Sequence, residues 1–271
     1  MILEKLTEAA RCRVEQKKKS ISPETIRREA EQLEGEKEFP FEKALKKQGM
    51  SLICEVKKAS PSKGILAEEF PYLQIASEYE AAGADAVSCL TEPDFFLGND
   101  RYLEEIAKTI RIPVLRKDFI VDPYMIYEAK LLGASAVLLI CAVLDREELR
   151  EGIRIAESLG LSVLTEVHDE KEVEQALEAG AEIIGVNNRN LKTFAVDLDT
   201  SFRLRKLVPP ECVFVSESGI RGLDDIRRLR ENGTDAVLIG ETLMRSREKT
   251  KLLETFRTVE KEGRRSGCQI R

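Results

Sequence analysis

Eight short apolar runs, spaced regularly along the chain, constrain its fold more than any other feature of the sequence. Each run is almost wholly apolar, which is typical of strands whose two faces are both covered by other structure. The segments between the runs carry apolar residues at helical spacing. Such an alternation predicts parallel strands joined by crossover helices. The runs lie at residues 51–57, 85–90, 112–116, 135–140, 162–167, 182–187, 212–217 and 235–240.

The junctions between the helical segments and the apolar runs also repeat. Gly83, Gly133, Gly180 and Gly233 each follow a helical segment just before a run, where helices commonly end in glycine. This weak internal repeat favours a (β/α)8 TIM barrel, an α/β fold, over an open doubly wound sheet. The expected helices include residues 73–82, 124–132, 147–159, 170–179 and 224–232.

The segment before the first run is predicted to be a helical N-terminal extension. Leu6, Ala10 and Val14 lie at helical spacing, and Ser22-Pro23 is typical of an N-cap followed by proline at the first helical position. No linker rich in glycine, serine or proline separates residues 1–48 from the rest, and they are too few to hold a core alone. We therefore expect one domain over residues 1–271, in which this extension covers part of the barrel.

The charge balance and the histidine count exclude several classes of function. The formal net charge is −6, so there is no basic excess to neutralise phosphates, and nucleic acid is not expected as a partner. The first residues are charged and no long apolar segment follows, so we expect a cytoplasmic protein without a membrane partner. His168 is the only histidine, which excludes a zinc site built from several imidazoles, and no metal is expected.

Charged and amide side chains stand where the apolar runs end. Because side chains alternate along a strand, Glu55 and Lys57 share one face, and so do Asn187 and Arg189. Lys117 follows another run in the same way. The carboxyl ends of parallel strands meet at one mouth, where a (β/α)8 barrel keeps its active site. The sequence therefore predicts a charged site at this end of the barrel.

Two lysines and three glutamates of this set are candidates for acid–base chemistry. If Lys57 and Lys117 lie close together, each ammonium lowers the pKa of the other, which would make one of them a proton donor near neutral pH. Burying Glu55, Glu166 and Glu217 is costly unless they are paired with cations or used in catalysis. Structural ion pairing of these groups is the alternative, and it is strongest for Glu217.

Glycine and serine after the last two runs indicate a phosphate site. Ser218-Gly219 and Gly240-Glu241 stand where barrels often bind phosphate, and glycine lets backbone N–H groups approach its oxygens. Ser60 adds a hydroxyl after the first run. Separately, the phenylalanines at positions 96 and 119 lie just beyond the second and third runs, where they could form an aryl pocket or belong to the core. The histidine at position 168 is predicted to be an ordinary surface or loop residue.

Seven segments stand in order along the chain, namely EVKKASPSKG (55–64), LTE with FFLG (90–92 and 95–98), LRKDFI (115–120), TEVH (165–168), GVNNRNL (185–191), SESGI (216–220) and IGETLM (239–244). Taken together, they resemble the motifs of the indole-3-glycerol phosphate synthase family. The resemblance covers essentially the whole chain and implies a (β/α)8 barrel of the tryptophan pathway. Its reaction would be that of a carbon–carbon lyase, converting 1-(2-carboxyphenylamino)-1-deoxyribulose 5-phosphate to indole-3-glycerol phosphate, carbon dioxide and water without a cofactor.

Together with the resemblance, these residues suggest a mechanism. Lys57 would hold the substrate carboxylate, Lys117 would donate a proton to the ketone oxygen, and Glu166 would assist loss of the hydroxyl group. Glu55 would orient the lysines, although which lysine serves which proton step stays open. Asn187 and Ser218 would hydrogen-bond the substrate beside Glu217, and Arg189 would line the aryl–carboxylate end. The phosphate would bind at Ser60, Gly219, Gly240 and Glu241. The apolar pocket would consist of Phe96, Phe119, Leu138 and Ile239.

Two other readings remain open from the sequence. One is a different phosphate-binding barrel, such as a sugar-phosphate isomerase or a Schiff-base aldolase, because a lysine at a strand end is what an aldolase needs. The other is a barrel that holds a phosphorylated ligand without catalysis. In each case the expected partner is a small phosphorylated molecule, and the protein is expected to be a monomer or a homodimer.

Overall fold

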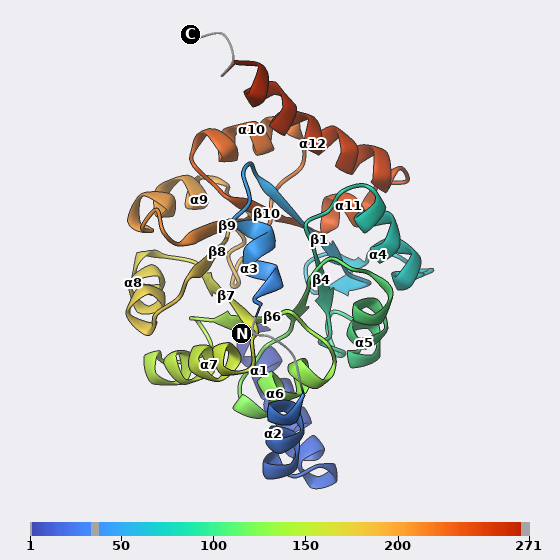
Figure 1. Ribbon diagram of the computed structural model, residues 1–271, viewed down its shortest axis with the longest axis vertical. Helices are drawn as coiled ribbons and strands as arrows, with labels where there is room; N and C mark the ends of the chain where they lie inside the picture. Colours follow the sequence, from blue (N-terminus) through green and yellow to red (C-terminus); the bar gives the residue numbers. More distant parts are fainter. Residues whose placement is uncertain (1, 34–37, 267–271) are drawn as a thin grey trace.

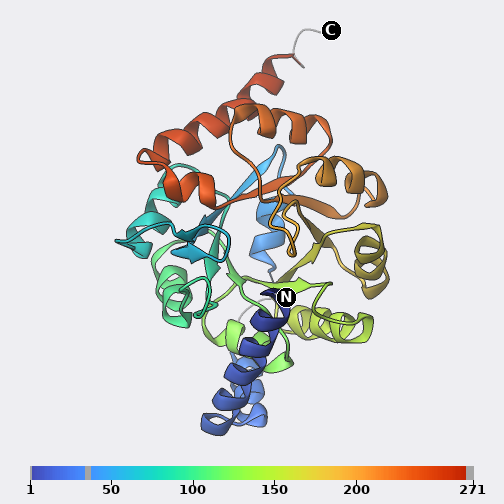
Figure 2. The same ribbon diagram turned by 180° about the vertical axis from the view of Figure 1, so that it is seen from behind.

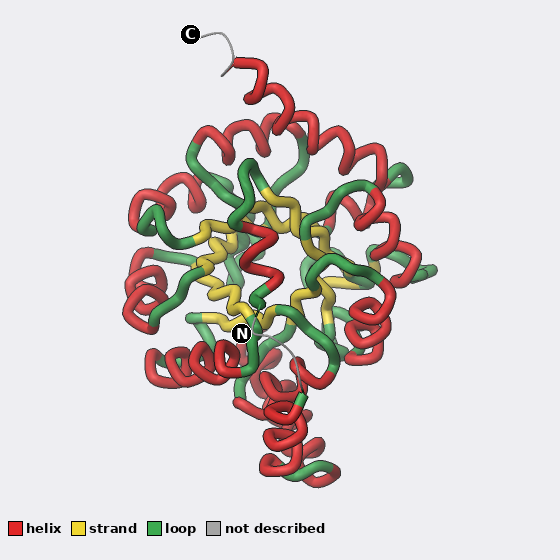
Figure 3. The backbone as a smooth tube through the Cα atoms, viewed as in Figure 1, coloured by secondary structure: helices red, strands yellow, loops and turns green. Residues whose placement is uncertain are grey.

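The computed structural model describes residues 2–33 and 38–266, and its centre is a closed barrel of parallel strands. Neighbouring strands along the chain pair with one another, and β1 closes the ring against β10 (Figures 1 and 3). The predicted barrel is confirmed, with strand ends within two residues of the expected ones. The strands are β1 (Ser51–Val56), β4 (Ala86–Leu90), β5 (Val114–Lys117), β6 (Ala136–Ile140), β7 (Ser162–Val167), β8 (Ile183–Asn187), β9 (Val213–Glu217) and β10 (Ala236–Ile239).

Helices surround the strands as an outer ring (Figure 3). Several begin at an Asp that caps the first turn, and in α7 the Asp145 side chain and Glu148 form a reciprocal capping box. Gly180 ends α8 with φ 93°, as expected for the left-handed position after a helix. The helices are α4 (Tyr72–Ala81), α5 (Asp100–Thr109), α6 (Pro123–Leu131), α7 (Arg146–Ser158), α8 (Glu170–Ala179), α9 (Asp199–Leu204), the 3-10 turn η1 (Arg205–Leu207), α10 (Leu223–Glu231), α11 (Glu241–Arg245) and α12 (Lys249–Ser266).

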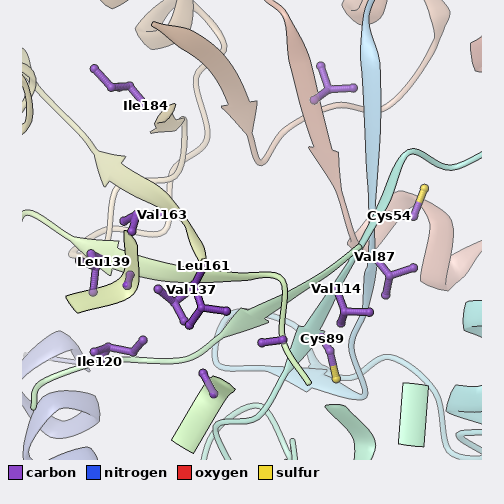
Figure 4. Packing of buried hydrophobic residues seen from close by; sticks show 14 of the residues in the cluster. Cys54, Val87, Cys89, Val114, Ile120, Val137, Leu139, Leu161, Val163 and Ile184 are labelled. Atoms are coloured by element: carbon purple, nitrogen blue, oxygen red, sulfur yellow. The ribbon is translucent and has the colours of Figure 1, made fainter. Parts of the chain in front are cut away.

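The strands are buried on both faces, and the two-residue alternation divides the core into two layers. In β6, Leu138 and Ile140 point into the barrel, whereas Val137 and Leu139 point outward against the helices. Figure 4 shows part of the outward layer, including Val137 and Leu139. The inner layer fills the barrel with branched side chains, so the interior is a packed core and not a pore.

The N-terminal extension touches both ends of the barrel. Its helices are α1 (Ile2–Ser20), α2 (Pro23–Gln32) and α3 (Pro40–Leu45), and Ser22 caps α2 as predicted. In Figure 1, α3 lies across the middle of the ring of strands, where Phe41 and Leu45 join the inner core at its amino-terminal end. Seen from behind, α1 lies on the opposite side (Figure 2). Residues 1 and 34–37 of the predicted extension lie outside the described residues.

A short hairpin follows the first barrel strand. It pairs β2 (Ala59–Ser60) with β3 (Gly64–Ile65) in antiparallel fashion. Within residues 2–33 and 38–266, no helix has both the length and the apolar character that crossing a bilayer requires.

Candidate active site

A cavity of about 580 Å³ opens at the carboxyl ends of the barrel strands. It brings together all the predicted site residues, which come from all eight barrel strands or the segments directly after them. Ile2 and Leu6 of α1 also line it, so the extension forms part of its wall. The predicted residues that line the cavity are Glu55, Lys57, Ser60, Phe96, Lys117, Phe119, Leu138, Glu166, Asn187, Arg189, Glu217, Ser218, Gly219, Ile239, Gly240 and Glu241.

Lys117, at the end of β5, lies between two carboxylates inside the barrel. Its Nζ is 3.0 Å from Glu166 Oε2 and 3.2 Å from Glu217 Oε2. Asn187 donates from Nδ2 to the other oxygen of Glu166, Oε1, at 3.2 Å. The three partners come from β7, β8 and β9, because inward-facing residues near the carboxyl ends of adjacent strands meet in a barrel.

The charges around Lys117 change the acid–base properties of the site. Burial alone disfavours its ammonium, but the carboxylates of Glu166 and Glu217 outweigh that effect and raise the pKa of Lys117 well above its ordinary value. The prediction that a neighbouring ammonium lowers this pKa is therefore wrong for Lys117. The sequence predicted that Lys57 and Lys117 lie at the same end of the barrel, but it did not predict that two carboxylates flank Lys117.

The pKa values of the two glutamates beside Lys117 shift in opposite directions. Burial raises the pKa of Glu166, but Lys117 and His168 outweigh it, so the pKa of Glu166 is lowered overall. Burial and the charge of Glu166 raise the pKa of Glu217 to about 7, in spite of its contact with Lys117. The site therefore holds an ionised carboxylate next to one that titrates near neutral pH.

Lys57 and Glu55, at the end of β1, form an ion pair with each other in the same cavity. The pair lies directly against Gly240, where a Cβ atom would overlap the Glu55 carboxylate and lie 2.9 Å from Lys57 Nζ. Gly185 likewise lies against Glu217, because a Cβ atom at position 185 would overlap the Glu217 carboxylate. Both glycines are therefore needed to make room for buried charged groups.

Ser218 adopts a backbone conformation that is rare for residues other than glycine. Its φ is 68°, and Gly219 follows with φ 85°, so the chain turns sharply after β9. The buried amide of Asn188 supports this turn, because its Nδ2 donates to the carbonyls of Glu217 and Ser218 at 2.9 and 3.1 Å. The strain is concentrated where the sequence predicted substrate contacts.

Two loops carry the aromatic side chains of the cavity. The ring centroids of Phe96 and Phe119 are 6.3 Å apart. The carboxylate of Glu92 accepts hydrogen bonds from three backbone N–H groups of the loop that leads to Phe96. Arg13 of α1 then joins the two loops, since its guanidinium contacts Glu92 at 3.3 Å and Asp118 at 3.0 Å. The extension thus fixes the predicted aryl pocket.

Basic side chains surround Glu241, beside the predicted phosphate site. Its carboxylate is 3.5 Å from Lys63 Nζ, 3.6 Å from Arg189 and 3.2 Å from Arg245. The guanidinium of Arg189, which was expected at the aryl–carboxylate end, contacts Glu241 at the start of α11. Arg221 also lines the cavity. Sequence reasoning did not single out residues 63, 221 and 245, because isolated basic residues carry no periodic signal.

His168 stands in the loop between β7 and α8, as the sequence predicted. Its side chain is not that of an ordinary surface residue, because it is only 16% exposed and lies between two carboxylates. The apolar face of α1 was recognised from its spacing, but nothing in the sequence indicated that Ile2 and Leu6 reach the mouth of the barrel.

Comparison with known proteins shows which protein family this chain matches. Residues 3–256 match the family described as indole-3-glycerol phosphate synthase. The chain is 60% identical to the indole-3-glycerol phosphate synthase of Ruminiclostridium cellulolyticum over 246 residues, which are 91% of this chain and 95% of that protein. It is 46% identical to that of Lachnoclostridium phytofermentans over 270 residues, which span 96% of this chain and all of the other.

A solved structure supports the architecture independently of sequence. The crystal structure of 3-hexulose-6-phosphate synthase from Salmonella typhimurium matches with a TM-score of 0.65, covering 79% of this chain and 99% of that one. The two sequences are only 17% identical, so this likeness shows the barrel fold alone.

Proposed function

The chain belongs to the indole-3-glycerol phosphate synthase family, and on that premise we propose that it catalyses this reaction in tryptophan biosynthesis. As a carboxy-lyase, it closes the indole ring of 1-(2-carboxyphenylamino)-1-deoxyribulose 5-phosphate with loss of carbon dioxide and water. The observation that carries the proposal is the contact of Lys117 with both Glu166 and Glu217 in the barrel mouth. An ammonium donor and an ionised base thus lie within one cavity.

The cavity has separate regions for the two ends of such a substrate. The phosphate binds to backbone N–H groups of Gly219 and Gly240 and to Ser60, with the basic side chains around Glu241 supplying positive charge. The aryl ring lies between the loops of Phe96 and Phe119. Lys57 holds the aryl carboxylate, which bends the chain so that the ring carbon approaches the ketone.

Each chemical step then uses a group that is already in place. As the ring carbon bonds to the ketone carbon, Lys117 gives its proton to the ketone oxygen, which becomes a hydroxyl group. Breaking the carbon–carboxylate bond releases carbon dioxide and restores the aromatic ring. The hydroxyl then leaves as water, with a lysine supplying the proton at oxygen and Glu166 removing the proton from the neighbouring carbon.

The protonation of Lys117 argues against a Schiff-base aldolase. An amine nucleophile must lose its proton before it can attack a carbonyl, whereas the two carboxylates raise the pKa of Lys117. The same environment suits a residue that stays an ammonium until a developing oxyanion takes its proton. Glu217, with its pKa raised to about 7, is placed to return that proton.

The wider setting of the enzyme follows from the same premise. We propose that residues 1–271 form a single domain, that the protein is a monomer or a homodimer, and that it acts in the cytoplasm. Size-exclusion chromatography with light scattering measures the oligomeric state directly.

A fluorescence assay for indole formation tests the function. The wild type should turn over the anilino-ribulose phosphate, and Lys117→Met should abolish turnover while substrate affinity stays within about tenfold, since only a transition-state interaction is lost. Glu166→Gln should chiefly lower kcat. Lys108→Met, an exposed substitution on α5, is the matched control and should behave as the wild type. Near-normal turnover by Lys117→Met would remove this residue from the acid role.

A further inference from the structure

His168 is held between two carboxylates at the edge of the cavity. Its Nδ1 lies 3.0 Å from Glu172 Oε2, and its backbone N–H donates to the same oxygen at 2.7 Å. On the other side of the ring, Nε2 lies 3.4 Å from Glu166 Oε1. This Nε2 is buried and has no hydrogen-bond partner among the described residues. Glu166 Oε1 is therefore the group that offsets the cost of burying this nitrogen.

Glu166 therefore has a cation-forming group beside each of its two oxygens. Lys117 Nζ is 3.0 Å from Oε2, and His168 Nε2 is 3.4 Å from Oε1. Glu217 provides an internal comparison, because it is equally buried and touches the same lysine, but its second oxygen has no hydrogen-bond partner. The two carboxylates differ in what faces the second oxygen, which in Glu166 is approached by both His168 Nε2 and Asn187 Nδ2, and their pKa values move in opposite directions.

The carboxylates near the imidazole favour its charged form. Glu172 comes from α8, Glu166 from β7, and Glu217 from β9, and each raises the pKa of His168 against the opposing effect of burial. The buried thiol of Cys141, just after β6, lies within the influence of Glu172 and Glu166, and burial raises its pKa, so it stays uncharged. On balance the pKa of His168 is raised above its ordinary value.

We propose that His168 is a positioning residue for Glu166: an imidazolium, anchored to α8 through Glu172, that fixes the base opposite Lys117 and keeps it ionised. This inference rests on the proposed function, in which Glu166 removes a proton. It assigns the histidine no contact with the substrate. The residue acts through the carboxylate, in the way that outer partners orient and tune a reacting group.

The single histidine allows a direct test of the contact. One imidazole C–H signal should titrate in a proton–carbon NMR experiment, and its pKa should lie above the ordinary value of 6.5. Glu166→Gln and Glu172→Gln should each lower that pKa by about one unit, because each removes an adjacent negative charge. Glu174→Gln, an exposed substitution on the same helix, is the matched control. An unchanged imidazole pKa in Glu166→Gln would overturn the proposal.

Kinetics test the consequence for the reaction. In His168→Gln, the acidic limb of the kcat/KM profile should move to higher pH by about one unit and kcat should fall about tenfold, while KM changes far less. A side chain that only fills space would not move the pH profile, so a wild-type profile overturns the inference. If His168→Gln does not fold, the NMR comparison decides alone. If the wild type does not form indole-3-glycerol phosphate, the proposed function fails while the NMR result still reports on the contact.

Discussion

Glu217→Gln should make the protein more stable, and the gain should grow with pH. In the folded protein the pKa of Glu217 is raised from 4.5 to about 7, so the folded state holds its proton more tightly than the unfolded chain. Stability is therefore lost as pH rises through this window. At about 1.4 kcal/mol for each pKa unit, the complete effect is about 3 kcal/mol. A glutamine mimics the protonated carboxyl at every pH and does not incur this loss.

Urea unfolding at about pH 5 and about pH 8 measures the difference. The free energy of unfolding of Glu217→Gln, relative to wild type, should be about 2 to 3 kcal/mol more favourable at the higher pH. Glu174→Gln, an exposed substitution on α8, is the matched control, and its effect on stability should be small and equal at both pH values. An equal effect of Glu217→Gln at both pH values would refute the reasoning.

Three further substitutions test how the barrel supports the cavity. Gly240→Ala should cost about 1 to 3 kcal/mol of stability and lower kcat, because the added methyl group overlaps the Glu55 carboxylate. Gly222→Ala should change neither quantity, because there is open space beside Gly222, and equal losses in both variants would contradict the packing argument. Phe41→Ala should lower the free energy of unfolding by about 3 to 5 kcal/mol with little change in kcat, since it packs at the far end; a large kcat defect in folded enzyme would speak against this separation. Arg13→Met should raise KM several-fold by releasing both aromatic loops, and a wild-type KM would show that α1 does not hold them.

The fold could be predicted because its signals are periodic. The apolar runs and the glycine-ended helices specify a closed alternation of strands and helices, and each strand was found within two residues of its expected place. The cavity residues could be predicted for a related reason, since side-chain alternation shows which residues face inward at a strand end. Phe96 was placed by its position just beyond such an end.

What the sequence left out depends on contacts between strands. Lys117 meets Glu166 and Glu217 only because β5, β7 and β9 bring their inner faces together across the barrel, and no spacing along the chain encodes those distances. The pKa of the lysine was therefore predicted in the wrong direction. The surroundings of His168 were missed for the same reason, because a loop position suggests exposure, whereas Glu172 on the next helix contacts the ring.

Arg116 and Lys117 are neighbouring cations on β5 whose side chains face opposite sides of the strand. Lys117 faces the cavity, while Arg116 faces outward and is buried in the helical layer, where its guanidinium contacts Asp100 at 2.9 Å and Glu128 at 2.8 Å. A shift of one residue in β5 would exchange these faces. Such a shift would place Lys117 among the partners of Arg116, so the ion pairs of Arg116 with Asp100 and Glu128 oppose it. The same ion pairs therefore keep Lys117 facing Glu166 and Glu217.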